Sequence, residues 1–106
     1  VFRSSCPDCQ RETRVLNALY PQLDPARVQL LAVGVRDSKA VVERFRDRFG
    51  VKYPLAIDPE GKLSRPYNIQ EVPTYFMLDA GRIVRYVGHE ETASQLLEKL
   101  NALAGR

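Results

Sequence analysis

The chain has 106 residues, a length that suits one domain with a single hydrophobic core. Apolar residues make up 44% of the chain, which excludes a disordered protein, and no apolar run approaches the ~20 residues that a membrane-spanning helix requires. The net charge is +3, but the arginines are dispersed and do not cluster with aromatic residues, so we expect no nucleic-acid partner.

The N-terminal segment contains the only two cysteines, Cys6 and Cys9, spaced as Cys-x-x-Cys. The apolar pair Val1-Phe2 precedes them and predicts the end of a strand, and a helical pattern over residues 7–20 follows. A strand that leads into a Cys-x-x-Cys opening a helix is typical of thiol–disulfide exchange. We expect Cys6 at the N-cap and Pro7 at the first helical position, where its missing N–H is no loss. The helix N-terminus favours a thiolate, and Cys9 lies one turn deeper on the same face.

Two other uses of the cysteine pair remain open. A structural disulfide closing so short a loop contributes only ~2 kcal/mol in the chain-entropy account, so stability is a weak reason for it. A structural zinc ion usually has four ligands, and His89 is the only further cysteine or histidine. We expect His89 to be a surface loop residue beyond the last strand. The sequence therefore favours redox chemistry at Cys6 and Cys9, with no metal and no other cofactor.

The remaining elements follow from apolar spacing and turn residues. Strands are predicted at residues 28–35, 54–57, 74–78 and 82–87. Further helices are predicted from an Asp37 or Ser38 cap to a stop at Gly50, over residues 62–68, and after the Thr92-Ala93-Ser94-Gln95 capping box. Reverse turns are predicted at residues 58–61 and 79–81. The order predicts an α/β fold whose mixed sheet has parallel strands first and an antiparallel hairpin last.

Two motifs in this order carry a resemblance to a known family. Cys6-Pro7-Asp8-Cys9 opens the first helix, and Val72-Pro73-Thr74 precedes a strand, a turn with glycine and a second strand. Together with Glu12 and the insert at residues 38–68, they resemble the thioredoxin-fold proteins, and more narrowly the TlpA/ResA-like thiol-disulfide oxidoreductases. The resemblance implies one thioredoxin-like domain over residues 1–106, incomplete at its N-terminus, with helices flanking a mixed central sheet whose first strand is largely truncated.

The resemblance also implies the roles of individual residues. The Val72–Pro73 bond is expected to be cis and to lie beside the cysteines, whereas a proline that merely starts a strand is trans. The Val72 backbone would pair with an extended substrate peptide, so Pro7, Val72, Pro73 and Thr74 are the expected substrate-binding residues. Glu12 is expected to relay the Cys9 proton, the alternative being a solvated charge paired with an arginine.

The sequence departs from related families in informative ways. Ser5 stands where many TlpA/ResA-like proteins have tryptophan before the first cysteine. The Pro-x-x-x-Thr-x-x-Cys motif of peroxiredoxins is absent, because Arg3 occupies the threonine position. The Asp8 carboxylate repels a thiolate at Cys6, so we expect a reducing rather than a strongly oxidising protein.

The expected activity is reduction of protein disulfides through the Cys6–Cys9 dithiol. Two alternatives are a non-catalytic peptide-binding adaptor of the same fold and a copper(I) metallochaperone. The expected partners are a protein or peptide disulfide or dithiol and an unidentified electron donor, with a membrane involved only through a removed N-terminal anchor. We expect a monomer in an extracytoplasmic compartment, either periplasmic or anchored facing outside, with the cytoplasm as the alternative.

Overall fold

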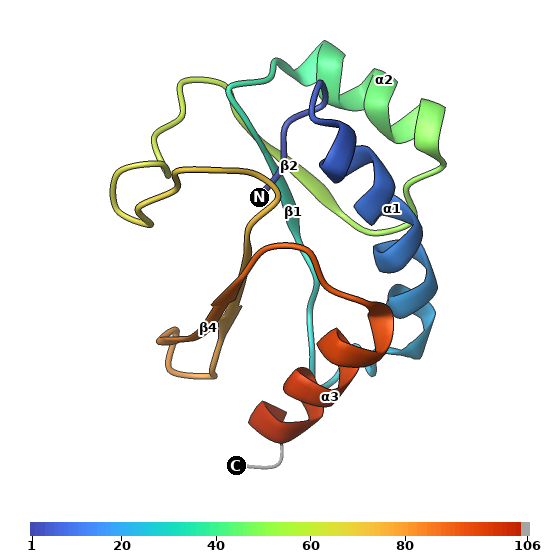
Figure 1. Ribbon diagram of the computed structural model, residues 1–106, viewed down its shortest axis with the longest axis vertical. Coiled ribbons are helices and arrows are strands. Elements are labelled where there is room, and N and C mark those ends of the chain that lie inside the picture. The colour runs from blue at the N-terminus through green and yellow to red at the C-terminus, as the bar shows by residue number, and fades with distance from the viewer. Residues whose placement is uncertain (105–106) are drawn as a thin grey trace.

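A computed structural model describes residues 1–104 and shows helices packed around short strands (Figure 1). In chain order the elements are α1 (Pro7–Leu19) with a 3₁₀ turn (Tyr20–Gln22), β1 (Ala32–Val35), α2 (Lys39–Phe49), β2 (Leu55–Asp58), β3 (Tyr75–Leu78), β4 (Val84–Gly88) and α3 (Ala93–Ala104). Strands β1 and β2 pair in parallel, and β3 and β4 pair antiparallel. The α/β class and the predicted strand directions are therefore confirmed.

The first two residues join the two strand pairs. Phe2 N donates to Val33 O, and Val35 N donates to Phe2 O, each at 2.9 Å, which continues the parallel side. On the other side, the Val1 nitrogen donates to Thr74 O at 2.7 Å, and Thr74 N donates to Val1 O at 3.1 Å. Residues 1–2 thus lie between β1 and the start of β3, and the mixed arrangement forms across them.

The core fills the space between these strands and the helices. Helix α1 packs against α3, and α2 packs against β2. Phe2 stacks on Phe45 of α2, with ring centroids 4.8 Å apart. A Cβ on Gly34 would lie 2.7 Å from Val42 Cγ2, so the absence of a side chain in β1 lets α2 approach this closely. Stacking of Phe2 on Phe45, and the close approach that Gly34 permits, therefore keep α2 packed against the strands.

The ends of α2 follow the sequence prediction and settle one alternative. Ser38 is the N-cap, and its Oγ accepts from Val41 N at 3.3 Å. Gly50 ends the helix with a φ of 60°, a left-handed conformation that glycine adopts without strain. Asp37 does not cap the helix; its carboxylate accepts from Ser4 N at 2.7 Å. That contact fastens the segment just before the cysteines to the start of α2.

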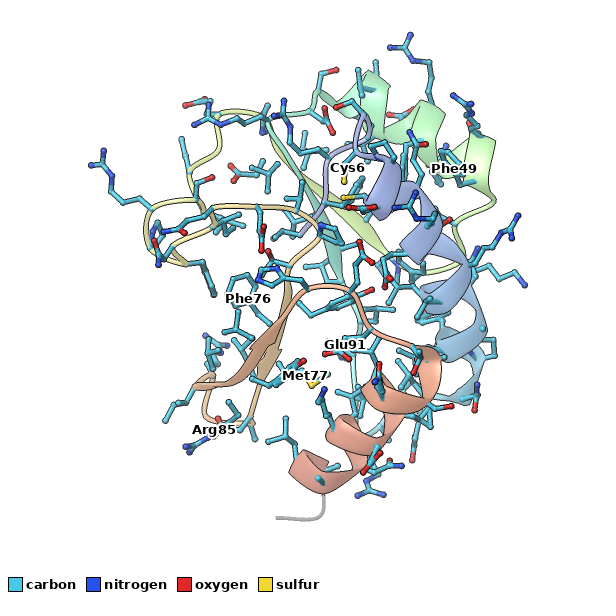
Figure 2. The ribbon with its side chains drawn as sticks, viewed as in Figure 1. Cys6, Phe49, Phe76, Met77, Arg85 and Glu91 are labelled. Atoms are coloured by element: carbon cyan, nitrogen blue, oxygen red, sulfur yellow. The ribbon has the colours of Figure 1, made fainter. Side chains whose placement is uncertain are left out.

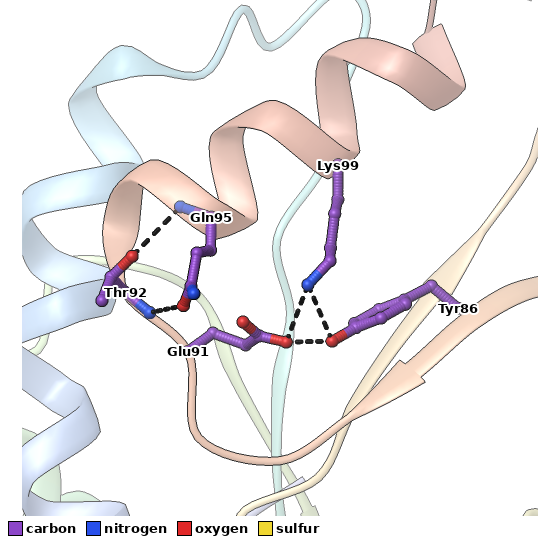
Figure 3. Close-up of polar contacts among 5 residues, drawn as sticks. All are labelled: Tyr86, Glu91, Thr92, Gln95 and Lys99. Atoms are coloured by element: carbon purple, nitrogen blue, oxygen red, sulfur yellow. Dashed lines mark hydrogen bonds and ion pairs between the residues drawn. The ribbon is translucent and has the colours of Figure 1, made fainter.

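Helix α3 is capped as predicted and tied to β4 by a polar cluster (Figure 3). Thr92 N donates to Gln95 Oε1 at 2.9 Å, and Gln95 N donates to Thr92 Oγ1 at 3.1 Å, which is the reciprocal capping box. Lys99 Nζ lies 3.0 Å from Glu91 Oε1 and 4.4 Å from the Tyr86 ring centroid. Figure 2 shows Glu91 between β4 and α3.

The helix predicted at residues 62–68 is wrong, because the segment forms successive turns. The Asp58 carboxylate accepts from Lys62 N at 2.9 Å and from Leu63 N at 3.0 Å, and so occupies the first amides. Pro66 has no N–H to donate, and Asn68 has a φ of 51°. The missing N–H of Pro66 and the left-handed backbone of Asn68 therefore interrupt the segment before it can form a regular helix.

The strand predicted at residues 28–35 is shorter than expected. It begins only at Ala32, whose N–H donates to Pro54 O at 3.1 Å, and Leu31 is 58% exposed. Pro54 precedes β2 and has no N–H, so the parallel ladder has no further donor on that side. The other three strands lie within two residues of their predicted bounds. Within residues 1–104, none of the helices combines the length and apolar character that crossing a bilayer requires.

Candidate active site

Cys6 lies at the N-terminal end of α1, where Figure 2 shows it at the far end of the molecule from Arg85 of β4. Its backbone is extended (φ −83°, ψ 116°), and it is the N-cap of α1, with Pro7 in the first turn. Its Sγ accepts from Cys9 N at 3.1 Å. The sulfur therefore occupies the place of a capping oxygen, where the backbone N–H groups and the helix dipole favour negative charge.

The two sulfurs differ in access to solvent. Cys6 is half-buried, whereas Cys9 is 3% exposed, and both are free thiols. Burial raises the pKa of the Cys9 thiol to about 12, because the thiolate would lose its solvation, and the hydrogen bond with Cys6 adds to the shift. Cys6 is therefore the more accessible sulfur, and Cys9 is a buried thiol that stays protonated at neutral pH.

A loop at residues 71–74, which we call the proline loop, faces Cys6. The Val72–Pro73 peptide bond is cis. The Cys6 thiol donates to Val72 O, with 3.6 Å between Sγ and the oxygen. Pro73 and Thr74 are buried, and the Thr74 hydroxyl donates to Glu71 O at 2.5 Å. The fold thus brings together two motifs that lie 66 residues apart in the sequence.

Glu12 is buried one turn beyond Cys9, with 8% of its surface exposed. The Tyr75 hydroxyl from β3 donates to its Oε2 atom. Burial raises the pKa of the Glu12 carboxyl above its usual range, while the Tyr75 hydrogen bond acts in the opposite direction. The alternative of a solvated charge paired with an arginine is therefore wrong for Glu12.

Two tyrosines that the sequence reading did not single out surround this carboxylate. Tyr75 and Tyr53 both have raised pKa values, chiefly because burial disfavours the charged phenolate, and the Glu12 charge adds to both shifts. Cys9, Glu12 and both tyrosines line one cleft. The alternation of β3 indicates which of its residues face inward, but the sequence does not indicate what Tyr75 meets there.

The acidic residue between the cysteines also has a partner. Arg11 forms an ion pair with Asp8, and their side chains are 68% and 43% exposed. The spacing of three residues places them on one helix face, which is a contact that the sequence could have indicated. An exposed pair of this kind contributes ~0–1 kcal/mol, so it reduces but does not remove the repulsion between Asp8 and a Cys6 thiolate.

The fold and the cysteine site together define a thioredoxin-like protein. A thioredoxin-like protein from Aeropyrum pernix matches with a TM-score of 0.79 at 15% identity, covering 95% of this chain and 73% of that one. StoA from Bacillus subtilis matches with a TM-score of 0.82 at 28% identity, covering 92% of this chain and 75% of that one. The predicted thioredoxin-like fold is confirmed.

The chain belongs to the AhpC/TSA family, whose model matches residues 1–87. The thiol-disulfide oxidoreductase ResA of Geobacillus kaustophilus is 37% identical over 82 residues, covering 77% of this chain and 47% of the relative. The chain spans about half the length of the curated relatives that it matches. These relatives confirm the resemblance to the ResA-like proteins.

The difference in burial between the sulfurs predicts selective alkylation. In the reduced, native protein at about pH 9, above the ordinary thiol value of ~8.5, iodoacetamide should modify Cys6 and leave Cys9 unmodified, because the Cys9 pKa is about 12. Peptide mapping by mass spectrometry measures the two sites separately. In denaturant both should react, which is the control, and equal labelling of the two cysteines in the native state would contradict the assignment.

Proposed function

We propose that this protein is a thiol-disulfide oxidoreductase that reduces protein or peptide disulfides through Cys6 and Cys9. The observation that carries the proposal is the placement of Cys6. Its half-buried sulfur caps α1 and lies 3.6 Å from Val72 O, with the buried Cys9 directly behind it. One accessible sulfur at a helix N-terminus and one protected partner are the two groups that thiol–disulfide exchange requires.

The exchange proceeds in two displacements. The Cys6 thiolate attacks one sulfur of the substrate disulfide, and the other substrate sulfur leaves as a thiolate that takes up a proton. Cys9 then loses its proton and attacks Cys6 Sγ in the mixed disulfide, which releases the second substrate thiol. The substrate gains two electrons and the protein loses two, which leaves a Cys6–Cys9 disulfide. A dithiol electron donor then reduces this disulfide and restores the two thiols.

The proline loop is the proposed contact for the substrate backbone. Val72 is half-buried beside Cys6, so an extended peptide can lie against its backbone as an added strand would. Pro7, which follows Cys6, is exposed, whereas Pro73 and Thr74 are buried. These four residues make up the proposed substrate-binding site.

Glu12 is proposed to accept the Cys9 proton during the second displacement. A thiol with a pKa of about 12 is almost wholly protonated at neutral pH, so its attack needs a base nearby. Glu12 lies one helical turn from Cys9 and lines the same cleft. Because burial raises the pKa of Glu12, its carboxylate is a better proton acceptor than a solvated one.

Replacement of Glu12 tests this relay. Glu12→Gln should slow release from a preformed mixed disulfide by about 100-fold, the lower end of the usual range for a general base. Stopped-flow measurement of the released thiol follows the step, and Glu98→Gln on the exposed face of α3 is the matched control.

In Tyr75→Phe the Glu12 carboxyl loses the hydrogen bond that lowers its pKa. The rise of the release rate with pH should therefore move to higher pH. An unchanged rate in Glu12→Gln excludes the relay.

The direction of electron flow follows from the charge beside Cys6. Strong oxidants of this type stabilise the thiolate of the reduced form, whereas Asp8 opposes it here. We therefore predict a midpoint potential of the Cys6–Cys9 couple near about −270 mV, the thioredoxin end of the scale, measured by equilibration with glutathione or dithiothreitol. Cys9→Ser, which cannot form the internal disulfide, is the control.

Other results of this titration, together with binding measurements, would identify the alternative functions. A potential near about −120 mV would make the protein an oxidant and overturn the proposed direction. Absence of a reversible two-electron couple, with retained binding of a peptide, would support the adaptor. Copper(I) binding in a fixed ratio that requires both cysteines would support the metallochaperone.

The ResA-named relatives also lead us to propose an extracytoplasmic, monomeric protein, with the cytoplasm as the alternative location. A thiol reagent that does not cross membranes should label Cys6 in intact spheroplasts. Labelling only after lysis would place the protein in the cytoplasm instead.

A further inference from the structure

His89 follows β4, and its ring contacts the proline loop. Its Nδ1 lies 3.1 Å from Pro73 O and 3.3 Å from Thr74 Oγ1. Its Nε2 lies 3.0 Å from Glu71 Oε1. The residue is on the surface, as the sequence indicates, but three of the four residues of the loop meet its ring. No sequence motif predicts these contacts.

The hydrogen-bonding partners of the His89 ring indicate whether its Nδ1 atom carries a hydrogen. The Thr74 hydroxyl gives its hydrogen to Glu71 O at 2.5 Å, so its lone pairs face the ring. Pro73 O is a carbonyl oxygen and only accepts. Nδ1 must therefore carry a hydrogen and donate to both oxygens, since an unprotonated nitrogen would face two acceptors.

The two sides of the ring differ in their surroundings. The His89 and Glu71 side chains are 50% and 67% exposed, and a solvent-exposed polar contact of this kind contributes little. The Nδ1 side faces Pro73 and Thr74, which are both buried. A carbonyl that loses its donor in partly buried surroundings is destabilised more than a solvent-exposed polar contact is. The Nδ1 contacts are therefore the ones that hold the loop.

We propose that His89 is a positioning residue for substrate binding, whose Nδ1–H fixes the proline loop so that the Val72 backbone is ready to pair with a peptide. The proposal rests on the proposed function of this loop. Val72 O contacts the Cys6 thiol, and the next carbonyl along the loop, Pro73 O, contacts His89. His89 acts through the backbone and has no part in the transfer of electrons.

Three substitutions separate the two sides of the ring. In His89→Asn the amide nitrogen can stand near the position of Nδ1 and donate to Pro73 O. In His89→Gln the longer side chain places its amide near the position of Nε2, toward Glu71. His89→Ala removes both contacts. The probes are insulin, a protein disulfide that needs the loop, and Ellman's reagent, a small disulfide that reaches Cys6 without it.

The expected result is a change in KM alone. His89→Ala and His89→Gln should raise the KM for insulin about fivefold, the factor expected for one lost hydrogen bond, with kcat unchanged. His89→Asn should stay within about twofold of the original KM, since it keeps the bond. All three variants should react with Ellman's reagent at the original rate, which shows that Cys6 and the fold around it are intact.

Three results would overturn the proposal. They are an unchanged KM in His89→Ala, rescue by glutamine instead of asparagine, or loss of the reaction with Ellman's reagent together with insulin reduction, which would mean a general structural role. A protein that reduces no insulin at all contradicts the proposed function instead. In that case the dissociation constant of a labelled extended peptide, measured by fluorescence anisotropy, replaces KM and must show the same ranking of the variants.

Discussion

The hydrogen bonds of Val1 and Phe2 are the constraint on which the rest of the structure depends. They connect the parallel pair β1–β2 to the antiparallel pair β3–β4, which share no ladder of their own. The same two residues position both halves of the site. Phe2 leads within four residues to Cys6, and Thr74, the partner of Val1, directly follows Pro73. The pairing that completes the sheet therefore also places the cysteines against the proline loop.

Burial then gives two chemically identical side chains different surroundings. Cys6 and Cys9 differ by one helical turn, yet one lies at the surface end of α1 and the other is almost fully covered. Burial raises the pKa of the covered Cys9 thiol to about 12, so this thiol is protonated at neutral pH. Glu12 and Tyr75 line the same cleft and are joined by a hydrogen bond, so the buried side of the site also has defined polar contacts.

The sequence predicted local features well because their causes are local. The Cys6 cap, the Gly50 stop and the Thr92 capping box depend on a few neighbouring residues. It failed at residues 62–68, where Pro66 has no N–H to donate and Asn68 adopts a left-handed backbone, so the segment forms turns. The contacts of Tyr75 with Glu12 and of His89 with Pro73 join residues 63 and 16 positions apart. Such contacts depend on which strand faces which helix, and spacing along the chain does not contain that information.

The segment that leads into the cysteine motif is held at one residue, Ser4, by two side chains. Ser4 N donates to the Asp37 carboxylate at 2.7 Å, and Ser4 O accepts from Gln10 Nε2 at 2.9 Å. Both backbone groups of Ser4 are thus occupied by side chains, one from α1 and one from the loop before α2, so the turn has little conformational freedom left to lose on binding. Exchange between sulfurs requires three atoms nearly in line, and a turn that is already ordered leaves that adjustment to the incoming chain. In the proposed exchange, the entropic cost of alignment would therefore fall mainly on the substrate disulfide.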